Sequence, residues 1–244
     1  MCFEWIYTTE KYKNRKKEDG LVSAVSGFFR RGGRKMGLVL GLFKPELSDF
    51  QKRKLLYEFH TFFDLSKDGE LEWKDFDLAR QKICELSGWK AGTPRHVQTN
   101  ELFKEIWRRL QDDGDENFDG KISEDEWIKM WESFNRQYIE QLQKKESGGP
   151  EPTVPAWLDK YMEYKFNLLD RTGNGYVDVD EFEYVMSDFG VSSREARNAF
   201  TIFSQNNERK LDLEYFKQLC TEYYRSDDPG ALGNFINGKL DFLE

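Results

Sequence analysis

The chain has only three cysteines and two histidines among 244 residues. Cys2, Cys84 and Cys220 are far apart and form no CxxC pair, which argues against a disulfide framework or a thiolate metal site. We expect them to be small, partly buried hydrophobic residues in a reducing compartment. Neither His60 nor His96 accompanies a nucleophile motif, and the phosphate-binding glycine motifs are absent. We therefore expect no enzymatic activity.

Long apolar runs are also missing. No stretch of about 18 uncharged apolar residues occurs, and the N-terminus lacks the charged-then-apolar order of a secretory signal. We therefore expect a soluble, cytoplasmic protein that is a monomer. The formal charge of −8 is uneven, because residues 1–46 contribute +5 and the remainder −13. An acidic body argues against nucleic acid as a partner.

Residues 1–46 differ from the rest in composition. The basic run KYKNRKKEDG precedes a stretch that mixes apolar residues with Arg, Lys and Gly. This pattern predicts a basic, flexible N-terminal extension. Because basic segments with apolar residues associate with anionic lipid, peripheral contact with a membrane surface is a second expectation for it.

Four helix–loop–helix units follow from Ser48, which is suited to cap a helix. Apolar residues then recur on one helical stripe at Leu55, Leu56, Phe59, Phe62 and Phe63. The same order of an aromatic-rich helix, an acidic loop and a second helix recurs three times. The segment KKESGGPEPTVP interrupts the series. The sequence thus predicts an all-α fold with two packed pairs, 47–144 and 156–244, joined by a linker at 145–155.

The acidic loops have the spacing of twelve-residue calcium loops. Such a loop supplies side-chain oxygens at positions 1, 3, 5 and 12 and a backbone carbonyl at position 7. Position 6 needs a left-handed turn and hence glycine. Position 8 is apolar because it pairs with its counterpart in the partner loop.

Loop 115–126 has two conceivable registers. A start at Asp115 puts Gly120 at the turn and Ile122 at the apolar position, whereas a start at Asp113 puts Phe118 at the turn. Only the first register satisfies the requirements. The predicted ligands are Asp115, Asn117, Asp119, the Lys121 carbonyl and Glu126.

Loops 170–181 and 64–75 also fit. The ligands predicted for the former are Asp170, Thr172, Asn174, the Tyr176 carbonyl and Glu181. Those predicted for the latter are Asp64, Ser66, Asp68, the Glu70 carbonyl and Asp75. Because Asp75 is one methylene shorter than the usual Glu, we expect this loop to bind Ca²⁺ more weakly or to hold Mg²⁺.

The fourth loop, 204–215, lacks the ligand pattern. It has Ser204 at position 1, Arg209 at the glycine position and Tyr215 at position 12. Tyrosine has no second oxygen, and arginine repels a cation. We predict no metal here, only a structural role as the partner of loop 170–181.

With these motifs, the chain resembles the calexcitins and, more distantly, the sarcoplasmic calcium-binding proteins of the EF-hand superfamily. The resemblance is carried by DGELEWKDFDLARQKIC, DENFDGKISEDEWIKMW, WLDKYMEYKFNLLDRTGNG and the terminal TEYYRSDDPGALGNFINGKL. It implies an intracellular binder of about three Ca²⁺ ions that acts in calcium signalling, buffering or both. It also implies that the C-terminal segment lies back on the apolar surface. An alternative is a membrane-tethered sensor that regulates a channel or another signalling target through residues 1–46.

Methionine is scarce in the helical units, where only Met130, Met162 and Met186 occur, against 20 Phe and 7 Trp in the chain. Sensors that open a groove use flexible methionines to contact many targets. The composition therefore favours a well-packed body over a promiscuous groove.

Overall fold

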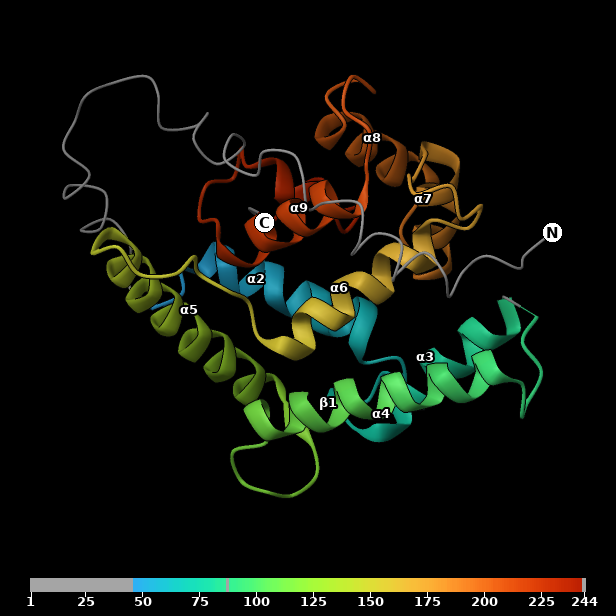
Figure 1. Cartoon of the computed structure of the whole chain (residues 1–244), viewed down its shortest axis with the longest axis horizontal. Helices are drawn as coiled ribbons and strands as arrows, with labels where there is room; N and C mark the ends of the chain where they lie inside the picture. Colours follow the sequence, from blue (N-terminus) through green and yellow to red (C-terminus); the bar gives the residue numbers. More distant parts are fainter. Residues whose placement is uncertain (1–45, 87, 243–244) are drawn as a thin grey trace. The chain divides into compact units, whose positions relative to one another are not determined.

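The computed structural model describes residues 46–86 and 88–242. The predicted N-terminal extension, apart from its last residue, and Cys2 lie outside these ranges. Within them, the chain forms helices and two very short strands, and four of the loops each connect the two helices of one helix–loop–helix unit (Figure 1). The first half contains α2 (Asp49–Glu58), a π-helix η3 (Phe59–Phe63), β1 (Glu70–Leu71), α3 (Trp73–Leu86), α4 (Pro94–Gly114), β2 (Ile122–Ser123) and α5 (Glu124–Glu146). The second half contains α6 (Ala156–Leu169), α7 (Val179–Asp188), α8 (Ser193–Phe203), α9 (Leu213–Arg225) and a 3-10 helix η4 (Leu232–Phe235). The predicted all-α fold of four helix–loop–helix units is confirmed.

Helix α2 begins at the predicted cap. Ser48 Oγ accepts a hydrogen bond from the Gln51 N–H, and the Ser48 N–H donates to Gln51 Oε1 at 3.0 Å, which completes a capping box. The helix does not remain α-helical to its end, because its last five residues form the π-helix η3.

The predicted apolar stripe of α2 needs one correction. Leu56 is only half-buried, whereas the charged residues Lys54 and Glu58 are fully buried. The reason is tertiary, since α9 packs against α2 and supplies Tyr224 as a partner of Glu58, while Asn234, beyond α9, is a partner of Lys54. Apolar periodicity alone does not show such partners.

One core extends through both halves of the fold. The rings of Phe63 and Tyr161 lie 4.7 Å apart, and those of Trp131 and Tyr224 stack at 4.5 Å with an interplanar angle of 12°. The described residues, 46–86 and 88–242, accordingly belong to one compact unit. The stretch between the two halves, 147–155, lies between α5 and α6, because α5 continues to Glu146.

A buried lysine holds the C-terminal segment, residues 226–242, which follows α9. Lys54 Nζ donates hydrogen bonds to the carbonyls of Tyr223 and Ser226 and to Asn234 Oδ1, at 2.7 to 2.8 Å. Burial lowers the pKa of Lys54 to about 7, but three acceptors match the three N–H groups of an ammonium. We therefore describe Lys54 as a charged anchor that joins α2, α9 and η4.

The rest of the C-terminal segment covers apolar surface, as the resemblance implies. Phe242 makes edge contacts with Phe50, Tyr57 and Tyr223. At Gly233 a Cβ atom would lie 2.4 Å from the carbonyl oxygen of Leu219. Only glycine permits this close approach of the backbone to α9.

The methionine and cysteine side chains of the described residues are buried. Met130, Met162 and Met186 are buried, as are the free Cys84 and Cys220. The buried environment predicted for these two cysteines is confirmed. The described helices include none that combines the length and the apolar character needed to cross a membrane.

The Lys54 anchor predicts an asymmetric effect of two substitutions on α2. Lys54→Met should lower the free energy of unfolding by about 3 kcal/mol, because it leaves buried acceptors without a donor. Lys52→Met removes a partly exposed ion pair with Glu132 at 3.3 Å and should cost less than about 1 kcal/mol. Urea denaturation at fixed Ca²⁺ measures both. Equal losses in the two variants would contradict the assigned role of Lys54.

Candidate metal-binding loops

Each of the four loops joins two helices and contacts a partner loop. Loop 64–75 pairs with loop 115–126 through β1 and β2, where Leu71 lies opposite Ile122. Loop 170–181 pairs with loop 204–215 through a bridge between Val177 and Leu211, whose N–H to carbonyl distance is 2.9 Å. All four residues occupy position 8, so the loops pair at the predicted apolar positions.

The aspartate at position 1 organises the first half of three loops. Asp115 accepts hydrogen bonds from the N–H groups of Asp119 at 3.1 Å and Gly120 at 2.9 Å. Asp64 and Asp170 accept the same two bonds, from positions 5 and 6 of their own loops. The position-6 glycines have nearly equal left-handed torsions, with φ of 84° at Gly69 and 86° at Gly120 and Gly175. The three loops thus share one backbone conformation.

Asp113, the rejected first ligand of loop 115–126, has a different environment. It belongs to α4, and its Oδ2 accepts a hydrogen bond from Trp157 Nε1 at 3.0 Å. Desolvation raises the pKa of this carboxyl. Asp113 therefore links α4 to α6 and does not take part in the hydrogen bonds inside the loop.

The carboxylate at position 12 joins each loop to its outgoing helix. Glu126 forms a capping box with Ser123 at the start of α5. Glu181 forms one with Asp178 at the start of α7, and its Oε1 also accepts the Thr172 N–H at 2.9 Å. These glutamates stabilise the first turn of a helix at the place where a calcium loop needs its last ligand.

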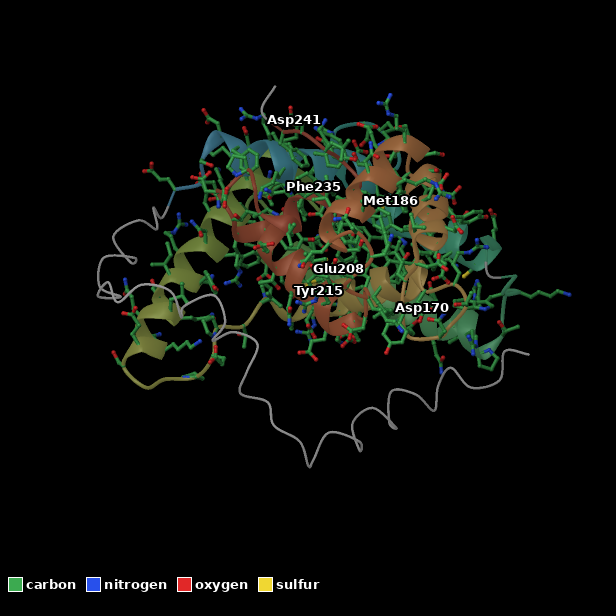
Figure 2. All side chains as sticks on the ribbon, turned by 90° about the horizontal axis from the view of Figure 1, so that it is seen from above. Asp170, Met186, Glu208, Tyr215, Phe235 and Asp241 are labelled. Atoms are coloured by element: carbon green, nitrogen blue, oxygen red, sulfur yellow. The ribbon has the colours of Figure 1, made fainter. Side chains whose placement is uncertain are left out.

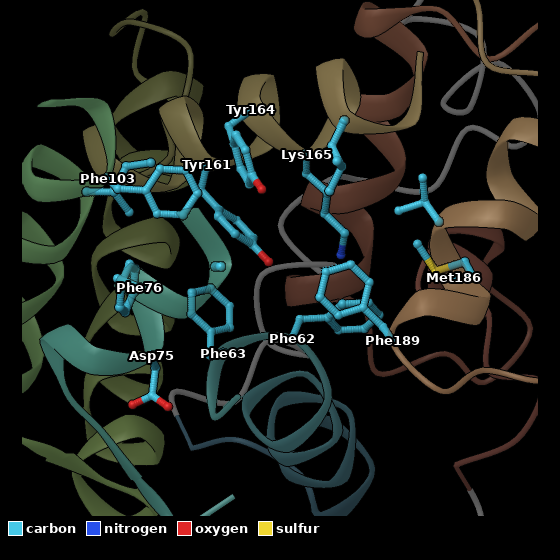
Figure 3. Close-up of a pocket in the computed structure, with 14 residues that line it drawn as sticks. Phe62, Phe63, Asp75, Phe76, Phe103, Tyr161, Tyr164, Lys165, Met186 and Phe189 are labelled. Carbon is cyan, nitrogen blue, oxygen red and sulfur yellow. The ribbon is translucent and has the colours of Figure 1, made fainter. Parts of the chain in front are cut away.

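Asp75 spans its loop despite its shorter side chain. Its two oxygens accept the N–H groups of Ser66 at 2.8 Å and Glu72 at 2.9 Å. Asp75 also borders a small cavity of about 30 Å³ among aromatic side chains, and Figure 3 shows its carboxylate directed away from these rings. The carboxylate therefore faces the loop.

The charged ends of the three loops are buried. The side chains at positions 1 and 12 retain only 1% to 7% of their exposure, and they are Asp64, Asp75, Asp115, Glu126, Asp170 and Glu181. Among the described residues, no Lys or Arg nitrogen forms an ion pair with any of them, and the one contact with a base joins Asp64 to His60 at 3.9 Å. Desolvation raises the pKa of the Asp170 carboxyl. Burying carboxylates without a cation is costly.

The ligands predicted at positions 3 and 5 lie at the surface side of the loops. Asn117 Oδ1 accepts the Asp119 N–H, and Asn174 Oδ1 accepts the Tyr176 N–H, both at 2.8 Å. Asp68 is paired with Lys74. Across residues 46–86 and 88–242, no three His, Cys, Asp or Glu side chains are arranged together as a metal cage. The donor set is nevertheless entirely oxygen, with carboxylates, amides, hydroxyls and carbonyls, which fits Ca²⁺ or Mg²⁺.

An ion pair that the sequence analysis missed connects the first two loops. Lys121 Nζ lies 2.5 Å from Glu70 Oε2 and 3.0 Å from Glu72 Oε1. Lys121 and Glu70 both occupy position 7 of their loops, so opposite charges at equivalent positions were the available signal. The ion pair therefore connects the two residues whose carbonyls are predicted as ligands.

The fourth loop has neutral groups at both buried ends. Ser204 is 1% exposed and Tyr215 is 5% exposed. The Tyr215 hydroxyl donates to the Phe203 carbonyl at 2.6 Å, and the Arg209 guanidinium lies 3.7 Å from the centre of the Tyr215 ring. Tyr215 and Glu208, two residues of this loop, are labelled in Figure 2. Side-chain packing thus occupies the positions that carboxylates occupy in the other three loops.

A buried polar cluster next to the first loop was also missed. Glu58 accepts a hydrogen bond from the Tyr224 hydroxyl at 2.8 Å and lies 3.8 Å from Lys165 Nζ. Lys165 in turn donates to Asn237 Oδ1 at 2.5 Å and lies over the Phe62 ring at 4.1 Å (Figure 3). The weak signal in the sequence was the spacing of Lys54 and Glu58, four residues apart on an apolar face.

Comparisons with known proteins agree with this geometry. The EF hand family model matches residues 112–131 and 164–186. Sarcoplasmic calcium-binding proteins I, III and IV of Branchiostoma lanceolatum are 26% identical over 195 residues, which cover 79% of this chain and 98% of that protein. Calexcitin-1 of Caenorhabditis elegans is 27% identical over 208 residues, which cover 81% of this chain and 90% of that protein.

A solved structure shares the fold. The sarcoplasmic calcium-binding protein from amphioxus matches with a TM-score of 0.65 at 23% identity, over 79% of this chain and 98% of that one. This likeness concerns the arrangement of helices and loops. The family match and the two sequence relatives show that the chain is similar to EF-hand proteins, among them the sarcoplasmic calcium-binding proteins and calexcitin-1.

Proposed function

We propose that the protein is a cytoplasmic calcium binder with three metal sites, at loops 64–75, 115–126 and 170–181. The observation that carries the proposal is the burial of two carboxylates at the ends of each of these loops without a basic partner among the described residues, apart from the distant His60. A divalent cation would offset their mutual repulsion and desolvation. The two curated relatives named above, described as calcium-binding proteins and calexcitin, support this assignment.

Loop 64–75 is proposed to prefer Mg²⁺ or to bind Ca²⁺ more weakly than the other two. Asp75 replaces the longer glutamate at position 12, and the position-5 carboxylate of Asp68 is already paired with Lys74. Both features reduce the number of oxygens available to the ion. Mg²⁺ needs fewer ligands and shorter distances than Ca²⁺.

Loop 204–215 is proposed to act without a metal. Arg209 and Tyr215 pack on each other where an ion and its last ligand would be needed. Leu211 of loop 204–215 is bridged to Val177 of loop 170–181. Because loop 204–215 keeps its conformation without an ion, it would hold loop 170–181 in the conformation that binds one. This lowers the ordering cost of binding at the third site.

We further propose that the protein works mainly as a buffer. The C-terminal segment covers the apolar surface between α2 and α9, and the three methionines of the helical units are buried. A groove-opening sensor needs such surface to become free on Ca²⁺ binding. Here the Lys54 anchor opposes its release.

Substitution of the position-12 glutamates tests the three-site assignment. Glu126→Gln and Glu181→Gln should each remove one Ca²⁺ from the stoichiometry of three, because an amide cannot replace the two-oxygen clamp. The fold should persist, since glutamine can also complete a capping box. Isothermal titration calorimetry gives the stoichiometry.

The matched control for these variants is Glu208→Gln in the fourth loop. It should leave the number of bound ions unchanged. Three ions bound by Glu181→Gln, or a loss of one ion in Glu208→Gln, would refute the assignment of the sites.

A one-methylene extension tests the first loop. Asp75→Glu should tighten Ca²⁺ binding there by roughly tenfold, equivalent to about 1.4 kcal/mol, because both carboxylate oxygens can then reach the larger ion. Mg²⁺ affinity should not rise. Calorimetric titrations with each ion measure the ratio, and an unchanged Ca²⁺/Mg²⁺ ratio would show that Asp75 does not set the preference.

Dye binding tests the buffer assignment. The wild type should show little change in the fluorescence of an apolar-surface dye when Ca²⁺ is added, whereas Lys54→Met should show a clear increase, because its C-terminal segment is no longer anchored. A large Ca²⁺-induced increase in the wild type would instead establish a sensor.

A further inference from the structure

The last helical turn before the first loop contains one residue more than its counterparts. The Asp64 N–H donates to the Phe59 carbonyl, five residues earlier, at 2.8 Å, which is the π-helical bond of η3. In the other three loops, the residue at position 1 donates to the carbonyl four residues earlier, at 2.8 to 3.0 Å. π-Turns of this kind are frequent at functional sites. The first loop therefore differs from the others in how it leaves its incoming helix.

The π-turn also changes the partner of one carbonyl. His60 lies four residues before Asp64, where the other loops have the acceptor for position 1. Its carbonyl instead accepts a hydrogen bond from Lys67 Nζ, at position 4 of the loop. The turn is thus joined to the loop by a side chain as well as by the backbone.

The carboxylate that closes the first loop is exceptional as well. Asp75 accepts the N–H groups of position 3, Ser66, at 2.8 Å and of position 9, Glu72, at 2.9 Å. In loop 170–181, Glu181 accepts the N–H groups of the same two positions at 2.9 and 3.1 Å. The aspartate is shorter by one carbon–carbon bond, about 1.5 Å. Two side chains of different length thus make the same pair of contacts.

The end of η3 and the start of α3 are packed together beside the loop. The rings of Phe63 and Phe76 lie 6.0 Å apart, and both residues border the cavity of about 30 Å³ that Asp75 also borders. Figure 3 shows the three side chains around this space. The number of residues in η3 therefore bears on the position of Asp75.

We propose that the π-turn compensates for the short side chain of Asp75. The additional residue lets position 1 and the residues after it lie nearer to the start of α3, so that an aspartate spans the loop. Helix α2 cannot supply this shift, because Lys54 and Glu58 hold it to α9. The inference rests on the proposed function, since it makes a narrowed loop the reason for the preference for Mg²⁺, whose ligands must lie closer than those of Ca²⁺.

Deletion of Thr61 from the full chain tests the inference. Thr61 is half-buried and is not a predicted ligand. Without it, Phe59 precedes Asp64 by four residues, so the same N–H and carbonyl can form an ordinary α-helical bond. Because α2 is held in place, the shorter turn should draw Asp64 back from α3.

Amide hydrogen exchange in the metal-free protein is the first readout. In the deletion variant, the N–H groups of Ser66 and Glu72 should exchange roughly tenfold faster, because Asp75 no longer reaches them. Addition of Asp75→Glu to the deletion should restore their protection. The control Thr61→Ala keeps the number of residues and should leave both exchange rates unchanged.

The second readout is the affinity of the first loop for Mg²⁺, measured by calorimetry in a chain that also carries Glu126→Gln and Glu181→Gln. Deletion of Thr61 should lower this affinity at least tenfold. The exchange measurement needs no metal, so the two proposals fail in different ways. If exchange changes as expected but the loop binds neither Mg²⁺ nor Ca²⁺, the proposed function fails and the role of η3 stands.

Three results would overturn the role of η3. They are unchanged exchange in a folded deletion variant, protection that Asp75→Glu does not restore, and equally fast exchange in Thr61→Ala. If circular dichroism shows that the deletion variant is unfolded, Glu181→Asp decides. Asp170 follows an α-helix that has no π-turn, so an aspartate at position 12 of that loop should fail to protect the Thr172 N–H. Thr172 exchange that stays as slow as in the wild type would show that an aspartate spans a loop without a π-turn, and would refute the inference.

Discussion

Paired burial of carboxylates at the ends of a loop is the constraint on which this structure depends. In each of the three acidic loops, position 1 is the residue that ends the incoming helix, and position 12 lies in the first turn of the outgoing helix. A negative charge is unfavourable at the C-terminus of a helix and favourable at an N-terminus. The aspartate at position 1 is therefore the member of each pair that gains most from a bound cation. The loop geometry and the helix boundaries thus follow from the same side chains.

The two loop pairs differ in the interactions that connect the partner loops. In the first pair, both loops carry buried carboxylates, and the side chains of Lys121, Glu70 and Glu72 form ion pairs that connect the two loops. In the second pair, one loop carries the charges and the other is closed by Arg209 on Tyr215. The second arrangement keeps the apolar contact of Val177 with Leu211 independent of a second ion.

Local features of the sequence predicted most of the helices and the loop conformation, because helical periodicity, caps and left-handed glycines act within a few residues. The capping of α2 by Ser48 and the left-handed glycines at position 6 of the three acidic loops are examples. The sequence did not reveal the burial of Lys54 and Glu58, since their hydrogen-bond partners are at least 166 residues away in the chain. The predicted metal ligands follow from the spacing of oxygen-bearing residues within each loop.

The C-terminal segment and the first loop are both attached to α2. This limits how far Ca²⁺ binding could move that helix. Lys54 anchors the segment from α2, and Glu58, one turn later, contacts Tyr224 of α9. The π-helix η3 then connects Glu58 directly to Asp64, the first residue of the loop. A rotation of α2 driven by ion binding would therefore have to separate a buried ammonium from its three acceptors and a buried carboxylate from a tyrosine hydroxyl. Since each separation costs more than a surface contact would, movement on ion binding should be absorbed within η3 and the loop, and α2 should stay in place.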